Sequence, residues 1–95
     1  MGLISKSANG WELHTIADGS LSCDNFQLDS NDIDEVERLL TAKFGKRMKE
    51  DKVFVSYDNW SGVFIMHIPG TKSPGSDELI RKIYGFLSRQ TPGEE

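Results

Sequence analysis

The sequence is poor in the residues that build thiol and metal chemistry. It contains one cysteine, Cys23, and two histidines, His14 and His67, among 95 residues. A single thiol excludes an internal disulfide framework and cannot form the thiolate cage of a structural zinc site. Basic residues are also outnumbered, since 11 Lys and Arg face 15 Asp and Glu for a net charge of -4. We therefore expect no general affinity for nucleic acid or for an anionic membrane.

Long hydrophobic runs are missing as well. No apolar stretch approaches the roughly 18–20 residues of a membrane span. The first ten residues, MGLISKSANG, lack the apolar core of a secretory signal, and on this ground we expect a cytoplasmic protein. The segment 70–75 contains Gly, Lys and Ser before a helix, but the GxxxxGK[ST] order of a phosphate-binding loop is absent. The sequence predicts no cofactor.

What the chain does contain is enough for one globular core. Its length is typical of a single domain, and 37% of its residues are hydrophobic, which is typical of a folded protein rather than a disordered one. We predict one domain over residues 1–95. Residues 1–9 and 91–95 are mostly small or polar and are expected to be loose termini.

Two segments carry the signature of a β-hairpin. Residues 11–28 contain two strand-like stretches around Asp18-Gly19, and residues 53–69 read VFVSYDNWSGVFIMHIP around Asn59-Trp60-Ser61-Gly62. Asp-Gly between apolar runs is a strong hairpin signal, and Asn at the start of a turn with Gly at its end predicts a type I turn with a G1 bulge.

Each predicted hairpin is followed by a predicted amphipathic helix. In the first helix the apolar residues Ile33, Val36, Leu40 and Phe44 are spaced by three and four, which puts them on one face. Acidic residues crowd its start and basic residues its end, as the helix dipole favours. In the second helix the apolar stripe comprises Leu79, Ile80, Ile83, Tyr84, Phe86 and Leu87.

The order ββαββα predicts an α+β fold. A four-stranded, mainly antiparallel sheet with both helices packed on one face would bury both helix stripes. The order of the strands in the sheet stays open, because nothing local determines how the hairpins join. Duplication of one ββα unit stays open too, since the two halves share their order but little sequence.

The register of the second hairpin predicts a binding surface. If the turn spans residues 59–62, Asp58 faces Val63 and Tyr57 faces Phe64, so one face of the hairpin collects the core residues Val53, Val55, Tyr57, Phe64, Met66 and Ile68. The reverse face then carries Phe54, Val63, Ile65 and His67, with Trp60 at its edge. Apolar patches and aromatic side chains are frequent at binding sites, so we predict partner binding through Phe54, Trp60, Val63, Ile65 and His67.

The predicted function is therefore that of a small binding module. The partner would be a protein or a second copy of the chain, as in an inhibitor of the immunity type, an accessory subunit or a homodimer. Coverage of the reverse face by loops of the same chain is the competing interpretation. A purely structural domain without a separable site is a third.

Catalysis is the alternative from another class. A two-residue Asp18-Gly19 turn would place His14 opposite Cys23, an arrangement that can activate a thiol. A turn over residues 16–19 would instead place His14 opposite Leu21. A histidine such as His67 can also act as an acid or base. No third orienting group is identifiable, and metal sites normally need three or four ligands, so we predict no catalytic residue and no metal.

Overall fold

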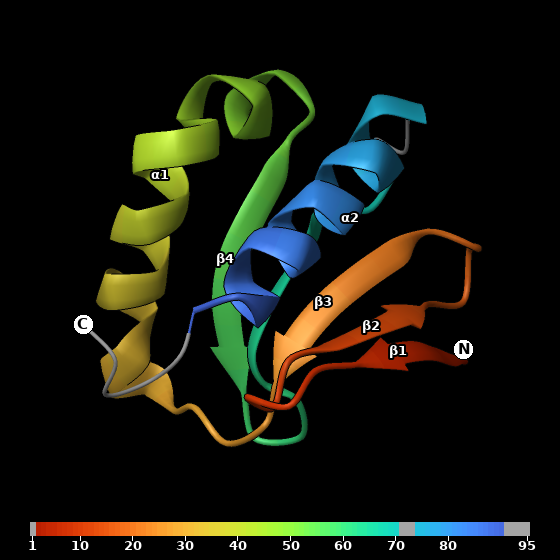
Figure 1. Cartoon of the computed structure of the whole chain (residues 1–95). Helices are drawn as coiled ribbons and strands as arrows, with labels where there is room; N and C mark the ends of the chain where they lie inside the picture. Colours follow the sequence, from red (N-terminus) through yellow and green to blue (C-terminus); the bar gives the residue numbers. More distant parts are fainter. Residues whose placement is uncertain (1, 71–73, 91–95) are drawn as a thin grey trace.

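The computed structural model describes residues 2–70 and 74–90. It is an α+β fold with a five-stranded antiparallel sheet and two α-helices on one face of the sheet (Figure 1). The strands are β1 (Leu3–Lys6), β2 (Glu12–Thr15), β3 (Leu21–Asn25), β4 (Val53–Asp58) and β5 (Gly62–His67). The helices are a short 3-10 turn η1 (Ser30–Asp32), α1 (Ile33–Glu50) and α2 (Pro74–Ser88).

The prediction of four strands in ββαββα order is wrong by one strand. Residues 3–6, expected to be part of a loose start, form β1 and pair antiparallel with β2. The Gly2 amide donates to the Thr15 hydroxyl at 2.9 Å, and the Ser5 hydroxyl lies 2.9 Å from that of Tyr84 on α2. Cross-strand pairing and contact with α2 thus order a segment that has little local strand signal. The predicted loose end over 91–95 lies outside the described residues.

The sheet order is β1-β2-β3-β5-β4. Strand β5 lies between β3 and β4 and is antiparallel to both, so β3 and β4 run parallel. Helix α1 makes the long crossover between these two strands, as parallel strands require. The two hairpins are thereby joined into one sheet through the β3–β5 pairing, which the local sequence did not predict.

A capping box starts the 3-10 turn η1 that leads into helix α1, and α1 itself runs further than its glycine suggests. The Asp29 carboxylate accepts from the Asn31 amide, and the Asp32 carboxylate accepts from the Asp29 amide, both at 2.9 Å. The helix continues through Gly45 and ends at Glu50, followed by Lys52 in the left-handed region at φ 56°. Burial of Met48 on the same face as Leu40 explains the continuation.

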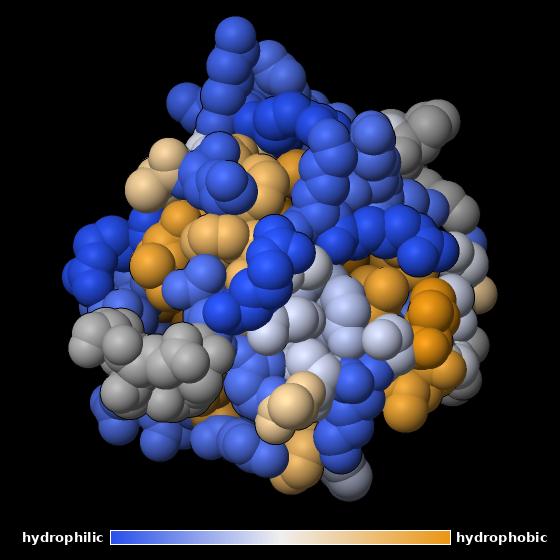
Figure 2. All heavy atoms as spheres, viewed as in Figure 1, coloured by the Kyte–Doolittle hydropathy of each residue, from blue (hydrophilic) through white to orange (hydrophobic). Residues whose placement is uncertain are grey.

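The core lies between the sheet and the two helices. Its buried side chains come from every strand except β1 and from both helices, and they comprise Trp11, Leu13, Leu21, Cys23, Val36, Leu40, Met48, Val53, Val63, Ile65, Leu79, Ile80, Ile83 and Leu87. Seen from the helix side, the surface is mostly polar, with hydrophobic atoms showing between α1 and α2 (Figure 2). There Phe44 and Phe86 form an edge-to-face pair with ring centroids 5.8 Å apart.

Candidate functional site

Only some of the residues predicted to bind a partner are accessible to solvent in the structure. Trp60 lies in the β4–β5 loop and is 93% exposed, and Phe54 is half-buried on the sheet face away from the helices. Val63 and Ile65 are fully buried and His67 is 1% exposed, all on the face that the helices cover. The prediction that these three residues share a face with Phe54 is wrong.

A shift of one residue in the hairpin register caused this error. Tyr57 pairs with Val63 and Val55 with Ile65, so Asp58 lies opposite Gly62 and the loop has three residues. The Asp58 carboxylate accepts from the Trp60 and Ser61 amides at 2.8 and 2.6 Å. The turn therefore starts at Asp58, not at Asn59. Because side chains alternate along a strand, one step transfers every side chain of β5 to the other face.

The close packing of Gly62 against the end of β3 explains this register. It has φ 76°, and a Cβ atom there would lie 2.3 Å from the Asn25 carbonyl oxygen and 2.6 Å from the Phe26 Cα. Only glycine fits so close to the end of β3. The position of Gly62 is thus dictated by a strand from the other hairpin, a contact that no pattern within residues 53–69 reveals.

The sheet face opposite the helices, which we call the open face, has an apolar centre. Phe54 of β4 pairs with Met66 of β5, and Phe64 of β5 pairs with Ser56 of β4. The rings of Phe54 and Phe64 meet edge to face at 6.0 Å, and all three apolar side chains are half-buried. A shallow depression of about 420 Å³ lies beside them; its lining consists of His14, Thr15, Ile16, Ser22, Asp24, Asp58, Ser61, Phe64 and Met66.

Charged side chains from β1, β2 and β3 lie next to this centre. Glu12 pairs directly with Asp24 across the strands, and His14 lies two residues further along β2 on the same face. The His14 Nε2 atom is 2.9 Å from Glu12 Oε1 and 3.3 Å from Asp24 Oδ1. On the far side, the Lys6 ammonium lies 3.6 Å from Glu12 Oε2. The sequence offered no sign of this cluster, because only the β2–β3 register brings Asp24 to Glu12.

The surroundings disfavour the charged form of Asp24. Burial of its carboxyl raises the pKa above the ordinary value of 3.8, and the nearby negative charges of Glu12 and Asp58 add to the rise. The His14 ring acts in the opposite direction without cancelling it. The open face thus brings the carboxyls of Glu12, Asp24 and Asp58 near one another, beside His14 and Lys6.

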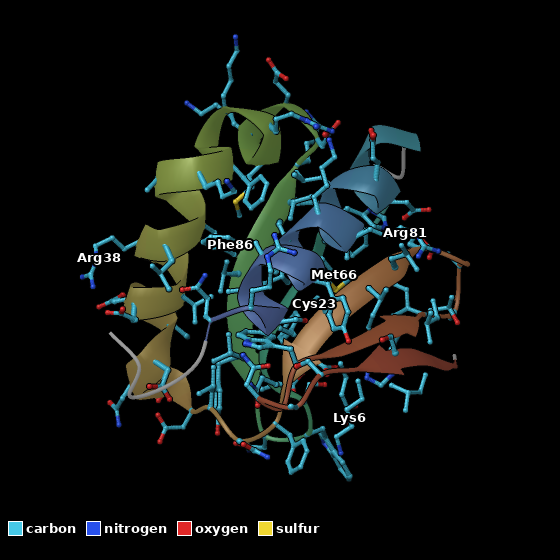
Figure 3. All side chains as sticks on the ribbon, in the orientation of Figure 1. Lys6, Cys23, Arg38, Met66, Arg81 and Phe86 are labelled. Carbon is cyan, nitrogen blue, oxygen red and sulfur yellow. The ribbon has the colours of Figure 1, made fainter. Side chains whose placement is uncertain are left out.

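The proposed His14–Cys23 pair is not formed. His14 pairs with Ser22, and Cys23 pairs with Leu13 and points to the helix side, where it is fully buried (Figure 3). The first turn spans Ile16 to Gly19, as in the second predicted arrangement, with the Gly19 amide donating to the Ile16 carbonyl at 2.8 Å. The Ile16 amide donates to the Ser20 carbonyl, so His14 lies opposite Ser22 and neither predicted pairing of His14 is right. Burial strongly raises the pKa of the Cys23 thiol, which removes the thiolate that a nucleophile needs.

His67 belongs to a buried polar group. Its Nδ1 lies 2.8 Å from the Ile68 carbonyl, which can only accept, so Nδ1 carries the hydrogen. In the neutral ring Nε2 then accepts from the Ser20 hydroxyl at 2.7 Å, with an Asp18 carboxylate oxygen 3.6 Å away. A serine donating to a histidine resembles an activated nucleophile. Both side chains are buried, however, so a substrate cannot reach the hydroxyl.

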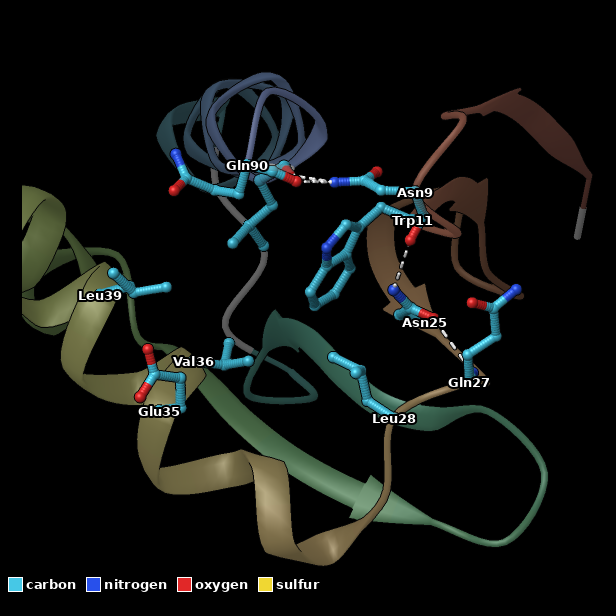
Figure 4. A pocket seen from close by; sticks show the side chains of 10 residues that line it. Asn9, Trp11, Asn25, Gln27, Leu28, Glu35, Val36, Leu39 and Gln90 are labelled. Atoms are coloured by element: carbon cyan, nitrogen blue, oxygen red, sulfur yellow. Dashed lines mark hydrogen bonds between the residues drawn. The ribbon is translucent and has the colours of Figure 1, made fainter. Parts of the chain in front are cut away.

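A second hollow of about 390 Å³ lies between the two helices, at the end where β3 leaves the sheet (Figure 4). Its lining residues are Asn9, Trp11, Asn25, Gln27, Leu28, Glu35, Val36, Leu39, Leu87 and Gln90. Asn9 ties the rim together, donating to the Leu87 carbonyl at 2.9 Å and also to the Gln90 carbonyl. Asn25 in turn donates to the Asn9 carbonyl at 3.3 Å. The side-chain amides of Asn9 and Asn25 on the rim are thus already used in hydrogen bonds within the protein.

No protein-family model, no curated protein and no solved structure matches this chain. Neither helix within the described residues is long and apolar enough to span a lipid bilayer.

Proposed function

We propose that this protein is a binding domain that docks on a basic surface of a partner protein through the open face of its sheet. The observation that carries the proposal is the half-buried Phe54–Phe64–Met66 centre on the face away from the helices. An apolar centre with a polar rim is the usual anatomy of a protein interface. Here the rim includes Ser56 and Asp58 of β4.

Charge on the open face favours a basic partner. Three acidic residues, Glu12, Asp24 and Asp58, lie there, and Lys6 pairs with Glu12. A positive partner surface would neutralise this excess, and complementary charge across an interface accelerates association and excludes wrong partners. The net charge of -4 acts in the same direction.

Trp60 supplies a candidate anchor beside this face. It is 93% exposed at the end of the β4–β5 hairpin, and Asp58 holds its backbone through the turn. Tryptophan is enriched among residues that dominate binding energy. Association through Phe54 and Trp60 therefore keeps the part of the predicted surface that lies at the protein surface, with Phe64 and Met66 replacing Val63 and Ile65.

The catalytic alternative has less support. It depended on Cys23 and His67, which are both buried, and on a His14–Cys23 contact that is not formed. Self-association through the open face is the competing outcome within the binding class, and the experiment below separates the two.

A photo-crosslinking residue placed at Asn59, the exposed neighbour of Trp60 in the β4–β5 loop, tests the proposal and leaves Trp60 in place. In a native lysate we expect a crosslinked partner whose yield falls as salt rises, because the attraction between exposed charges is screened. The same photo-crosslinking side chain at Leu39, on the helix side, is the matched control and should not capture that partner. A Phe54→Ser, Phe64→Ser variant should stay folded and lose the crosslink.

Three results would contradict the proposal. The first is equal capture by the Phe54→Ser, Phe64→Ser variant, verified as folded by circular dichroism. The second is capture from Leu39 but not from Asn59. The third is a crosslink only to a second copy of the chain, accompanied by a dimer in light scattering that the double variant abolishes; that would establish a homodimer instead.

A further inference from the structure

We propose that Glu12, His14 and Asp24 form a binding site for one divalent transition-metal ion of the Zn²⁺ or Mn²⁺ type. The inference goes beyond the proposed function and does not depend on it, because the ligands act within one protein molecule. The ligand atoms of the three side chains all lie within 4.8 Å of one another. They belong to adjacent strands of the sheet, so the backbone holds them together without a flexible loop.

The pairing of β2 and β3 explains why these atoms converge. Glu12 and His14 are two residues apart on β2, and side chains at that spacing point to the same face. Asp24 is the direct cross-strand partner of Glu12. The imidazole extends over this pair, so that one ring nitrogen reaches both carboxylates. A ladder of regular hydrogen bonds thus presents three ligands on one side of a common point.

The distances suit coordination to a single ion. Zinc binds imidazole nitrogen and carboxylate oxygen at about 2.0–2.2 Å, so two neighbouring ligand atoms on one ion are separated by about 3–3.5 Å. His14 Nε2 lies 2.9 Å from Glu12 Oε1 and 3.3 Å from Asp24 Oδ1. Both separations already fall near this range. Rotation of the two carboxylates would bring their oxygens around an ion seated at Nε2.

The chemistry of the ligands selects the class of ion. Imidazole suits zinc and carboxylate suits manganese, whereas calcium and magnesium prefer sites made of oxygen alone. With His14 neutral, Glu12 and Asp24 contribute two negative charges that a divalent ion would balance. Lys6 lies on the outer side of Glu12 at 3.6 Å, about half exposed, and so leaves the His14 side of the carboxylates accessible.

The site would keep open coordination positions. Three protein ligands leave room for water or for a ligand from another molecule. The depression lined by Ser22, Asp58, Phe64 and Met66 adjoins His14 and Asp24, so the free positions would face it. The Asp58 carboxylate accepts hydrogen bonds from the Trp60 and Ser61 amides and is not needed as a ligand.

Calorimetric titration of the full chain with ZnCl₂ and with MnCl₂ tests the proposal. We expect one equivalent to bind, and the His14→Ala and Asp24→Asn variants to lose at least about tenfold in affinity. Asp34→Asn removes an exposed acid from the start of α1 and should bind as the unaltered protein does. Circular dichroism shows whether each variant is folded.

Paramagnetic broadening by Mn²⁺ in amide NMR spectra locates the ion in the unaltered protein, independently of any variant. We expect broadening centred on Glu12, His14 and Asp24. The proposal is overturned if neither ion binds at up to millimolar concentration. It is also overturned if the broadening centres on the acidic residues that begin α1, or if the His14→Ala variant is folded and binds both ions with unchanged affinity.

Discussion

The Nε2 atom of His67 lies 2.7 Å from the Ser20 hydroxyl, and both side chains are sealed inside the core. These residues come from different hairpins, β5 and the end of the β2–β3 turn, so their bond links the two halves of the sheet. A buried polar group that loses its partner costs about 1–3 kcal/mol.

We therefore expect Ser20→Ala to lower the free energy of unfolding by about 1–3 kcal/mol, because His67 Nε2 would lose the hydroxyl. Urea denaturation measures the change. Ser56→Ala, on the half-exposed edge strand β4, is the matched control and should change stability by less than about 0.5 kcal/mol. Equal effects of the two substitutions would show that the buried bond contributes nothing.

The register of the β4–β5 hairpin can be tested at two adjacent residues. Ile65 is fully buried against the helices, whereas Met66 lies half-buried on the open face. Truncation of a buried aliphatic side chain costs about 2–5 kcal/mol. We expect Ile65→Ala to show such a loss in denaturant unfolding and Met66→Ala to show a clearly smaller one. The opposite order would restore the register inferred from the sequence.

Alanine substitutions at Gly62 and Gly70 distinguish the cost of backbone strain from the cost of steric overlap. Both glycines have positive φ, 76° and 86°, but a Cβ atom at Gly70 would meet none of the described residues within 4 Å. Gly70→Ala should therefore cost only the left-handed conformation, about 1–2 kcal/mol. Gly62→Ala adds a collision with the backbone of Asn25 and Phe26, so we expect a larger loss in thermal unfolding. Similar melting temperatures for the two variants would contradict the close packing of β5 on β3.

The thiol of Cys23 should be unreactive toward thiol reagents in the folded protein. It is fully buried and its pKa is raised by that burial, so an aromatic disulfide reagent should react only with the unfolded chain. We expect the reaction at pH 8 to be slow in buffer and complete within minutes in denaturant. Rapid reaction under native conditions would revive the interpretation of Cys23 as a nucleophile.

Because the pKa of Asp24 is raised, we expect removal of this carboxyl to stabilise the protein in a pH-dependent way. Because the folded state holds the Asp24 proton more tightly than the unfolded chain, this carboxyl favours folding below pH 3.8 and loses that contribution as pH rises through its folded pKa. At pH 7, where the unfolded chain carries this carboxyl ionised, its burial in the folded state costs free energy. Asp24→Asn should therefore raise the melting temperature at pH 7 and make little difference below pH 3.8.

Asp34→Asn, at the exposed start of α1, serves as the control and should not stabilise the protein, since an acid there is favourable. A lower melting temperature of Asp24→Asn at pH 7 would mean that the contact with His14 outweighs burial.

The features that could be read from the sequence are local ones. The stripe of Ile33, Val36, Leu40 and Phe44 indicates a helix, and Gly19 and Gly62 mark two turns, because capping, helical periodicity and turn geometry depend on near neighbours in the chain. These signals predicted both α-helices, both hairpins and the α+β class.

Tertiary contacts decided the rest. The segment Leu3–Lys6 becomes a strand only by pairing with β2, and β3 meets β5 only after α1 has crossed between them. The register of β5 follows from the fit of Gly62 against Asn25. A slip of one residue changes almost nothing in local propensity but exchanges the two faces of a strand. The sequence therefore specified the elements, whereas contacts between distant residues determined that Val63, Ile65 and His67 are core and that Glu12, His14 and Asp24 meet.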